Sequence, residues 1–166
     1  DEFAAISAAT TDELTGLFNR RGFNQLVRFT LSIARRRAEP LTLGWLDLDR
    51  FKEINDRYGH EEGDNALKVM AELMRTSFRE ADLLVRFGGD EFAVLFADTD
   101  EQGAWIAMQY LAEQVEQYNA RRLHPWSLHF SWGLSEFDHN GNDLQQWMKD
   151  ADEKMYAMKQ QRKRAT

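Results

Sequence analysis

The sequence predicts an α+β domain of the ferredoxin-like type, in which helices flank a central sheet. Three observations favour this fold. Helical and strand-like hydrophobic patterns alternate along the chain, and two strand-like runs joined by Gly88-Gly89 stand in the middle of that alternation. The chain has 166 residues, 43% of them hydrophobic, which is enough for one domain with one core. A hairpin between helices is also the arrangement of polymerase palms, so we expect a palm-type sheet.

The first helix and the first strand have the clearest patterns. Apolar residues recur at helical spacing over residues 20–37, and the run ends in arginines, whose charge suits a helix C-terminus. Thr11 or Asp12 is the expected cap of this helix, and Pro40 prevents it from continuing. Residues 41–49 are too few for a typical helix and are mostly apolar, so they predict a strand that is buried on both faces.

The remaining elements follow from the same periodicities. We expect two helices, the two strands around the glycines, a long amphipathic helix, a further strand and a final helix. Their predicted ranges are 52–58, 63–78, 82–87, 90–96, 99–122, 127–137 and 143–163. No repeat or internal linker interrupts this order. Residues 12–166 are therefore predicted to form one domain, and residues 1–11 to be the end of an upstream linker helix.

Composition argues against several classes of function. The formal net charge of −7 argues against a nucleic-acid-binding protein, which normally carries a basic surface. No apolar run approaches the roughly 20 residues that span a bilayer, so we expect no membrane contact by this fragment. The chain has no cysteine, which rules out disulfides and thiolate metal sites and suits a cytoplasmic location. A membrane anchor elsewhere in a longer parent protein is left open.

Acidic residues stand at two places where strands are predicted to end. Asp47 and Asp49 close the first strand, and they share a face because they are two residues apart. Asp90 and Glu91 lie at the hairpin tip, and Asp90 approaches Asp47 if the hairpin pairs beside the first strand. Converging carboxylates repel each other, and a hard cation such as Mg²⁺ relieves that repulsion. Taken alone, however, either pair is better explained as solvated surface acids.

A resemblance becomes visible at Gly88-Gly89-Asp90-Glu91-Phe92. The chain resembles the GGDEF family of diguanylate cyclases, whose namesake motif is intact here. Further stretches are similar to other motifs of that family and stand in the family's order. They are residues 12–21, residues 47–52 with 54–56, residues 58–60 with 63–64, and residues 151–152 with Tyr156 and Lys159. The resemblance therefore covers nearly the whole chain.

The resemblance implies a nucleotidyltransferase that condenses two GTP molecules into cyclic di-GMP and two pyrophosphates. In each half-reaction, a ribose 3′-hydroxyl attacks the α-phosphate of the other GTP. The implied cofactor is Mg²⁺ or Mn²⁺, with two ions per active half-site. The implied metal ligands are Asp47, the Leu48 carbonyl, Asp90 and Glu91. The last two are also the implied catalytic residues.

The resemblance also implies nucleotide contacts at two places. On the guanine it places Asn55 and Asp64, and it makes His60 a substrate contact on the same loop. On the triphosphate it places Phe51, Lys52, Lys159 and Lys163. Taken alone, Lys52 is equally well explained as a solvated surface charge, and Asn55 and His60 as ordinary hydrogen-bonding residues of loops and helix ends. Lys163 stands where the family usually has an arginine, and it cannot form the planar bidentate fork of a guanidinium. Either a neighbouring arginine substitutes for it, or GTP binds more weakly.

Regulation is implied by a second motif. Arg79 and Asp82 resemble the family's inhibitory product site, so we expect them to bind cyclic di-GMP. Tyr110 or Gln109 stands where many members supply a second arginine, so we expect weak inhibition. The two-fold symmetry of the product implies a homodimer for catalysis. An upstream sensory domain is expected outside this chain.

Two other interpretations stay open. The chain could be a catalytically inactive GGDEF module that binds GTP or cyclic di-GMP as a regulatory receptor, or an interaction domain with no nucleotide role. Asp47, Asp90 and Glu91 are all present, which favours the enzyme. An interaction domain would leave the polar loops unexplained. Synthesis of cyclic di-GMP from GTP would discriminate among the three.

Overall fold

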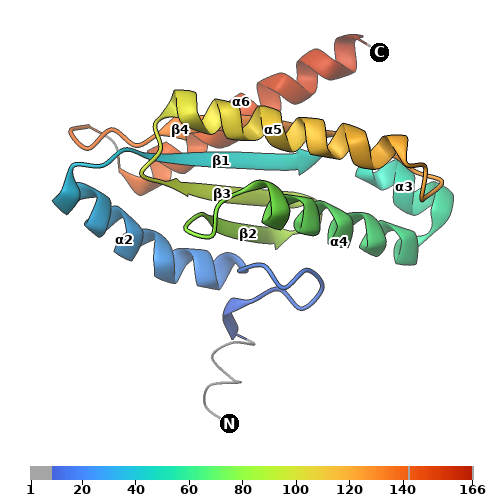
Figure 1. The fold of residues 1–166 in the computed structure, drawn as a ribbon, viewed down its shortest axis with the longest axis horizontal. Helices are drawn as coiled ribbons and strands as arrows, with labels where there is room; N and C mark the ends of the chain where they lie inside the picture. The colour runs from blue at the N-terminus through green and yellow to red at the C-terminus, as the bar shows by residue number, and fades with distance from the viewer. Residues whose placement is uncertain (1–8, 142, 166) are drawn as a thin grey trace.

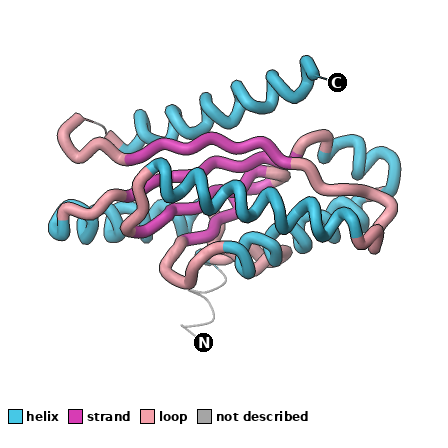
Figure 2. Tube along the Cα trace, turned by 45° about the horizontal axis from the view of Figure 1, so that its top comes forward, coloured by secondary structure: helices cyan, strands magenta, loops and turns pink. Residues whose placement is uncertain are grey.

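The computed structural model describes residues 9–141 and 143–165. A four-stranded antiparallel sheet in the order β2-β3-β1-β4 lies between layers of helices (Figures 1 and 2). Its elements are α2 (Arg20–Arg37), β1 (Leu41–Leu48), α3 (Phe51–Tyr58), α4 (His60–Ser77), β2 (Leu83–Gly88), β3 (Glu91–Ala97), α5 (Glu101–Ala120), β4 (Phe130–Glu136) and α6 (Leu144–Ala165). This order and pairing confirm the predicted ferredoxin-like α+β fold.

The start of the chain differs from the prediction in one detail. The N-cap of α2 is Asn19, whose side chain accepts a hydrogen bond from the Gly22 N–H, and not Thr11 or Asp12. Asp12 instead closes a tight turn by accepting from the backbone and hydroxyl of Thr15. Of the predicted linker helix, residues 9 and 10 are helical, and residues 1–8 lie outside the described part of the chain.

β1 is the centre of the sheet and is buried on both faces, as its sequence predicts. Leu43 and Trp45 pack on the face that α2 and α6 cover. Leu46 and Leu48 pack on the opposite face, under α4 and α5. The side chains alternate in this way because successive strand residues point to opposite faces.

Helix α6 lies unusually close to the sheet. A Cβ atom on Gly133 in β4 would stand 2.3 Å from both the Ala151 carbonyl oxygen and the Met155 nitrogen. Only a glycine permits this approach of helix backbone to strand backbone. The first half of α6 is buried there through Trp147, Ala151 and Met155, while its last turns extend beyond the sheet (Figure 1).

The predicted strand over residues 127–137 is shorter than expected. Pairing with β1 begins at Phe130, because the backbone of Leu128 is bonded instead to the side chain of Asn119 on α5. Within the described ranges, no helix is both long and apolar enough to cross a membrane.

Candidate active site

Four segments meet at one end of the sheet: the end of β1, the β2–β3 turn, the start of α3 and the last turns of α6. The Leu48 N–H donates to the Asp90 carbonyl oxygen at 3.2 Å, which fixes the turn beside the end of β1. Asp47 stands directly opposite Glu91 in the β1–β3 register. The turn residues Gly88 and Gly89 have φ angles of 138° and 53°, as the two glycines predict.

Asp47 is the residue of this site whose pKa is shifted most. Its Oδ2 atom lies 2.8 Å from the Lys159 Nζ, whereas its buried Oδ1 atom has no hydrogen-bond partner within the described ranges. Burial raises the pKa of Asp47 from 3.8 to about 6; the neighbouring Asp90 carboxyl adds to this rise, and Lys159 opposes it. Asp47 and Asp90 therefore converge, as expected for groups that share a cation.

Two cations of α6 face the end of β1. The Lys159 ammonium donates to the Leu48 carbonyl oxygen at 3.2 Å, in addition to its ion pair with Asp47. The Arg162 guanidinium lies 3.2 Å from Asp49 Oδ2 and donates to the Phe130 carbonyl. Asp49 also accepts a 2.7 Å hydrogen bond from the Ser131 hydroxyl. Asp49 and Arg162 are thus part of the site. From the sequence, Asp49 was expected only as an acid at the end of a strand, and Arg162 only as one of the arginines beside Lys163.

Asp47, Asp90, Glu91 and Asp152 together form an acidic cluster. The Trp45 indole N–H donates to Glu91 Oε1 at 2.9 Å and so fixes the orientation of that carboxylate. Burial raises the pKa of Asp152, and the negative charges of Glu91 and Asp47 raise it further. The sequence gives Asp152 only as part of a family motif, since its proximity to β1 and β3 depends on how α6 packs.

A divalent cation fits this arrangement only with help from groups other than carboxylates. Among the residues that the structure describes, no three His, Cys, Asp or Glu side chains are grouped as a metal site. Mg²⁺ needs only one or two protein carboxylates, and it completes its shell with carbonyls, water and phosphates. The unpartnered Asp47 Oδ1, the Leu48 carbonyl and Asp90 are oxygen donors of the right kind. The residues present therefore fit such an ion.

A groove of about 870 Å³ adjoins the acidic cluster, between the start of α3, the end of α5 and the last turns of α6. Its lining includes five cationic side chains, namely Arg50, Lys52, Lys159, Arg162 and Lys163. The structure thus brings the predicted phosphate contacts Lys52, Lys159 and Lys163 to one place. Phe51 begins α3 and packs against the core. A groove rich in cations suits a triphosphate.

The predicted guanine contacts gather at a different corner, where α3 meets α4. A Cβ atom on Gly63 would stand 1.8 Å from Asn55 Oδ1, so the glycine lets the Asn55 side chain lie against the start of α4. His60 and Asp64 are exposed on the same first turns of α4. The eight residues of α3 span about 12 Å, so the start of α4 lies at the other end of α3 from its first residue, Phe51.

Arg86 links the start of the chain to the β2–β3 turn and was not predicted from the sequence. Its guanidinium forms an ion pair with Asp12 at 2.9 Å and donates twice to the Gly89 carbonyl, at 3.0 and 2.8 Å. Both side chains of the pair are largely buried, with 13% and 18% exposed. Burial raises the pKa of Asp12, but hydrogen bonds from Thr15 and Arg86 outweigh it, and the pKa falls below its usual value. Arg86 is therefore a positioning residue for the turn.

Arg79 and Asp82 lie in the α4–β2 loop, and the six residues of β2 place this loop about 20 Å from the β2–β3 turn. The Asp82 side chain is 2% exposed and accepts hydrogen bonds from the backbone N–H groups of Arg79 and Ala97. Its other contact is the Arg79 guanidinium at 3.2 Å. Asp82 is thus committed to holding the loop, while Arg79, 58% exposed, is accessible. Tyr110 is exposed on α5.

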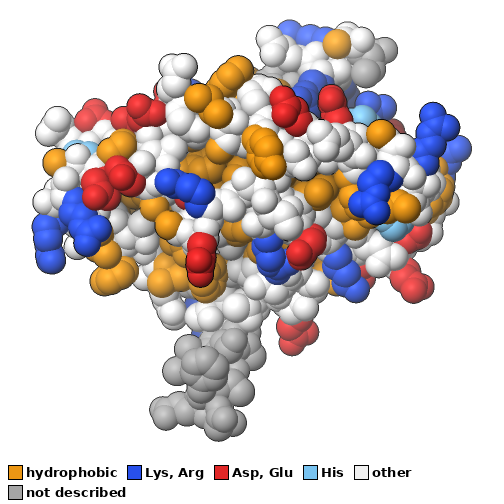
Figure 3. Space-filling view, in the orientation of Figure 1, with side chains coloured by type: hydrophobic (Ala, Val, Ile, Leu, Met, Phe, Trp, Pro, Cys, Tyr) orange, Lys and Arg blue, Asp and Glu red, His pale blue; other side chains and the backbone are white. Residues whose placement is uncertain are grey.

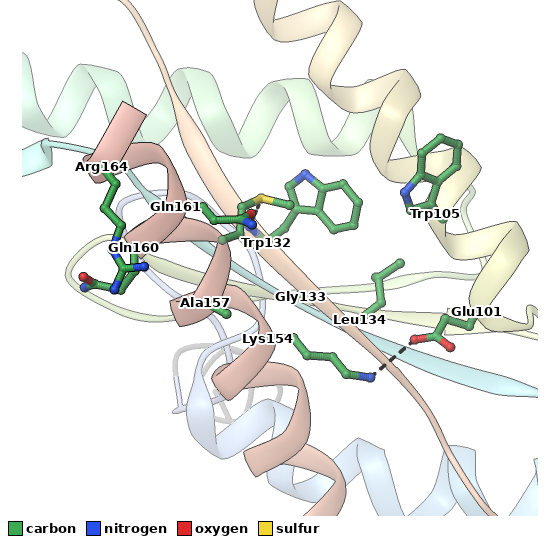
Figure 4. Close-up of a pocket in the computed structure, with 11 residues that line it drawn as sticks. Glu101, Trp105, Trp132, Gly133, Leu134, Lys154, Ala157, Gln160, Gln161 and Arg164 are labelled. Carbon is green, nitrogen blue, oxygen red and sulfur yellow. Dashed lines mark hydrogen bonds and ion pairs between the residues drawn. The ribbon is translucent and has the colours of Figure 1, made fainter. Parts of the chain in front are cut away.

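A second groove, of about 710 Å³, lies between α5, β4 and α6 and contains none of the predicted site residues. Trp105 and Trp132 line it, and Lys154 lies 3.6 Å from Glu101 across it (Figure 4). On the face shown in Figure 3, cationic and acidic side chains are interspersed, with hydrophobic side chains between them.

The fold and the site together define a ferredoxin-like α+β domain that holds converging carboxylates and a cationic groove at one end of its sheet. The family model described as "Diguanylate cyclase, GGDEF domain" matches residues 9–165. The chain belongs to this family, the GGDEF domains of diguanylate cyclases.

Individual relatives are similar over most of the chain. The probable diguanylate cyclase DgcC of Escherichia coli is 32% identical over 151 residues, 91% of this chain and 41% of that protein. The cyclic di-GMP phosphodiesterase NbdA of Pseudomonas aeruginosa is 37% identical over 143 residues, 86% of this chain and 18% of that protein. The chain thus spans less than half of either relative. The GGDEF domain of DgcB from Caulobacter crescentus, solved in complex with c-di-GMP, superimposes with a TM-score of 0.83 at 26% identity and covers 92% of this chain and 91% of that one.

Proposed function

We propose that residues 12–166 are the catalytic domain of a diguanylate cyclase. The observation that carries the proposal is the convergence of Asp47 and Asp90 beside a groove lined by five cationic side chains. The carboxylates suit divalent ions and a reacting hydroxyl, and the groove suits a triphosphate. The proposed reaction joins two GTP molecules into cyclic di-GMP and releases two pyrophosphates.

The acidic cluster would organise the reacting groups. Bound Mg²⁺ or Mn²⁺, two ions per half-site, would lower the pKa of the attacking hydroxyl and neutralise the leaving pyrophosphate. Asp47, the Leu48 carbonyl, Asp90 and Glu91 would hold these ions. Asp90 would also accept the proton of the 3′-hydroxyl, beside Glu91, which the Trp45 indole holds in one orientation.

The nucleotide would lie along α3. Lys52, Lys159, Arg162 and Lys163 would hold the phosphates in the groove, with Phe51 at the start of the helix. Asn55, His60 and Asp64 would hold the guanine at the other end of the helix. A carboxylate accepts from guanine N1–H and N2–H₂, whereas adenine offers no such pair of donors, so we expect GTP to be preferred strongly over ATP.

Catalysis would need two copies of the domain. Each half-site holds one GTP, and the product is two-fold symmetric, so an isologous homodimer is the natural arrangement. An upstream sensory domain would promote this dimer, and the reaction would take place in the cytoplasm, where GTP is supplied. Specific activity should therefore rise with protein concentration, and a constant value across a dilution series would argue against the dimer.

One experiment separates the enzyme from an inactive receptor module. Purified chain is incubated with GTP and Mg²⁺ or Mn²⁺, and cyclic di-GMP is measured by chromatography. We expect product from the wild type and from Glu113→Ala, a control on an exposed part of α5, and none from Asp90→Ala. GTP binding without any product from the wild type would favour the receptor, and near-native activity of Asp90→Ala would remove Asp90 from its role.

A further inference from the structure

Lys159 contacts the acidic cluster and also lines the cationic groove. Its ammonium lies 2.8 Å from Asp47 Oδ2, 3.2 Å from the Leu48 carbonyl oxygen and 3.9 Å from Asp49 Oδ1. The first two of these oxygens belong to the proposed metal ligands. The same side chain also lines the cationic groove. Lys159 therefore stands on the border between the acidic cluster and the groove.

We infer that Lys159 is a resident counter-ion of the acidic cluster, which a divalent cation must displace from Asp47 and the Leu48 carbonyl. This inference rests on the proposed function. A divalent ion needs oxygens at about 2.0–2.1 Å in a near-octahedral shell, so it competes with the ammonium for the same carboxylate and the same carbonyl. Two positive charges a few ångströms apart also repel each other in a partly buried site.

The cationic groove offers the displaced ammonium a second position. Lys159 is 28% exposed, has a flexible four-carbon stem and already lines the adjoining groove, so a change of side-chain rotamer can carry its ammonium from Asp47 into the groove without any movement of α6. Arg162, one turn further along, keeps its own bonds to Asp49 and to the Phe130 carbonyl and so holds the helix in place. The triphosphate that arrives with the metal would then receive the ammonium.

Two binding equilibria should therefore respond in opposite directions when the charge is removed. Without the ammonium, the cation has no competitor for Asp47 and no repelling neighbour, so it should bind more tightly. A triphosphate should bind more weakly, because the groove has lost one of its five cations. A lysine that only stabilises the fold would not produce this pair of opposite effects.

The test is a Mn²⁺ titration of the purified chain without nucleotide, with free Mn²⁺ followed by its paramagnetic resonance signal. We expect Lys159→Met and Lys159→Gln to bind Mn²⁺ about tenfold more tightly than the wild type. Lys159→Arg keeps the charge and should not gain affinity. Lys149→Met is the matched control, because Lys149 lies on the same helix, is 68% exposed and pairs with Glu153. Asp47→Asn should abolish the binding, which would identify the site.

The second measurement is calorimetry of GTP in the presence of a metal chelator, and Lys159→Met should bind GTP more weakly. Unchanged or weaker Mn²⁺ binding by both uncharged variants, with thermal unfolding showing that they are folded, would overturn the inference. Binding that survives Asp47→Asn would overturn it too. The titration needs no turnover, so the absence of cyclic di-GMP synthesis would refute the proposed function and leave this result standing.

Discussion

Replacing Asp47 by asparagine should stabilise the fold at neutral pH. Burial and the neighbouring Asp90 carboxyl raise the pKa of Asp47 from 3.8 to about 6. Between these values the folded protein holds a proton that the unfolded chain has released, so the free energy of unfolding falls as the pH rises through this range. A rise of about two pKa units corresponds to about 3 kcal/mol. The side chain is 17% exposed, and partial hydration should reduce the effect to about 2 kcal/mol.

Urea unfolding followed by tryptophan fluorescence, in the presence of a metal chelator, measures this effect. The stability of Asp47→Asn minus that of the wild type should be about 2 kcal/mol larger at about pH 7.5 than at about pH 4. Glu113→Gln is the control, since it removes an exposed carboxylate on α5 that is not part of the acidic cluster. A difference for Asp47→Asn that does not change with pH would refute the reasoning, because it would mean that the carboxylate ionises without penalty in the folded state.

Three further predictions concern the surroundings of the site. Arg86→Met and Asp12→Asn should each destabilise the fold, and a double-mutant cycle from urea unfolding should give a coupling of about 1–3 kcal/mol; additive effects would contradict a direct link. Gly63→Ala should displace the Asn55 side chain and weaken GTP binding about tenfold by calorimetry while the fold is kept, and unchanged affinity would remove Asn55 from the guanine site. Arg79→Ala should weaken inhibition by cyclic di-GMP and also lower the melting temperature, since Arg79 donates to the Ala97 carbonyl; equal inhibition constants would exclude Arg79 from the product site.

The fold could be predicted from the sequence where local pattern and tertiary packing agree. The bounds of α2 are those predicted, because its apolar periodicity and its terminal arginines lie within the segment, and Pro40 follows shortly after it. The start of β4 was placed too early because the bonds from Asn119 to Leu128 join α5 to the strand approach, and no local signal reveals them. The cap of α2 was placed wrongly because Asp12, a good capping residue, closes a different turn.

The residues of the candidate site could likewise be located from the sequence only where a local signal marks them. The acids at the end of β1 and at the β2–β3 turn could be located from strand ends and glycines, and their roles from the family resemblance. The ion pairs of Lys159 and Arg162 could not, because they join residues more than a hundred positions apart, and many alternative pairings exist in so charged a chain. Arg86 was missed for the same reason, since its partner Asp12 lies 74 residues away.

The absence of a side chain at Gly133 sets the distance between α6 and the sheet, and therefore the position of the cationic side chains of α6. The helix packs against the sheet between Trp147 and Met155, and Lys159 lies one turn after Met155. We expect this part of the helix to move as one rigid body on the strand. A methyl group added at residue 133 would clash with the backbone of α6 at Ala151 and Met155 and push the C-terminal turns of the helix away from the sheet. Lys159 would then lose its reach to the Leu48 carbonyl without any change in its own chemistry. A position outside the proposed nucleotide and metal contacts would thus change the affinity for both proposed ligands.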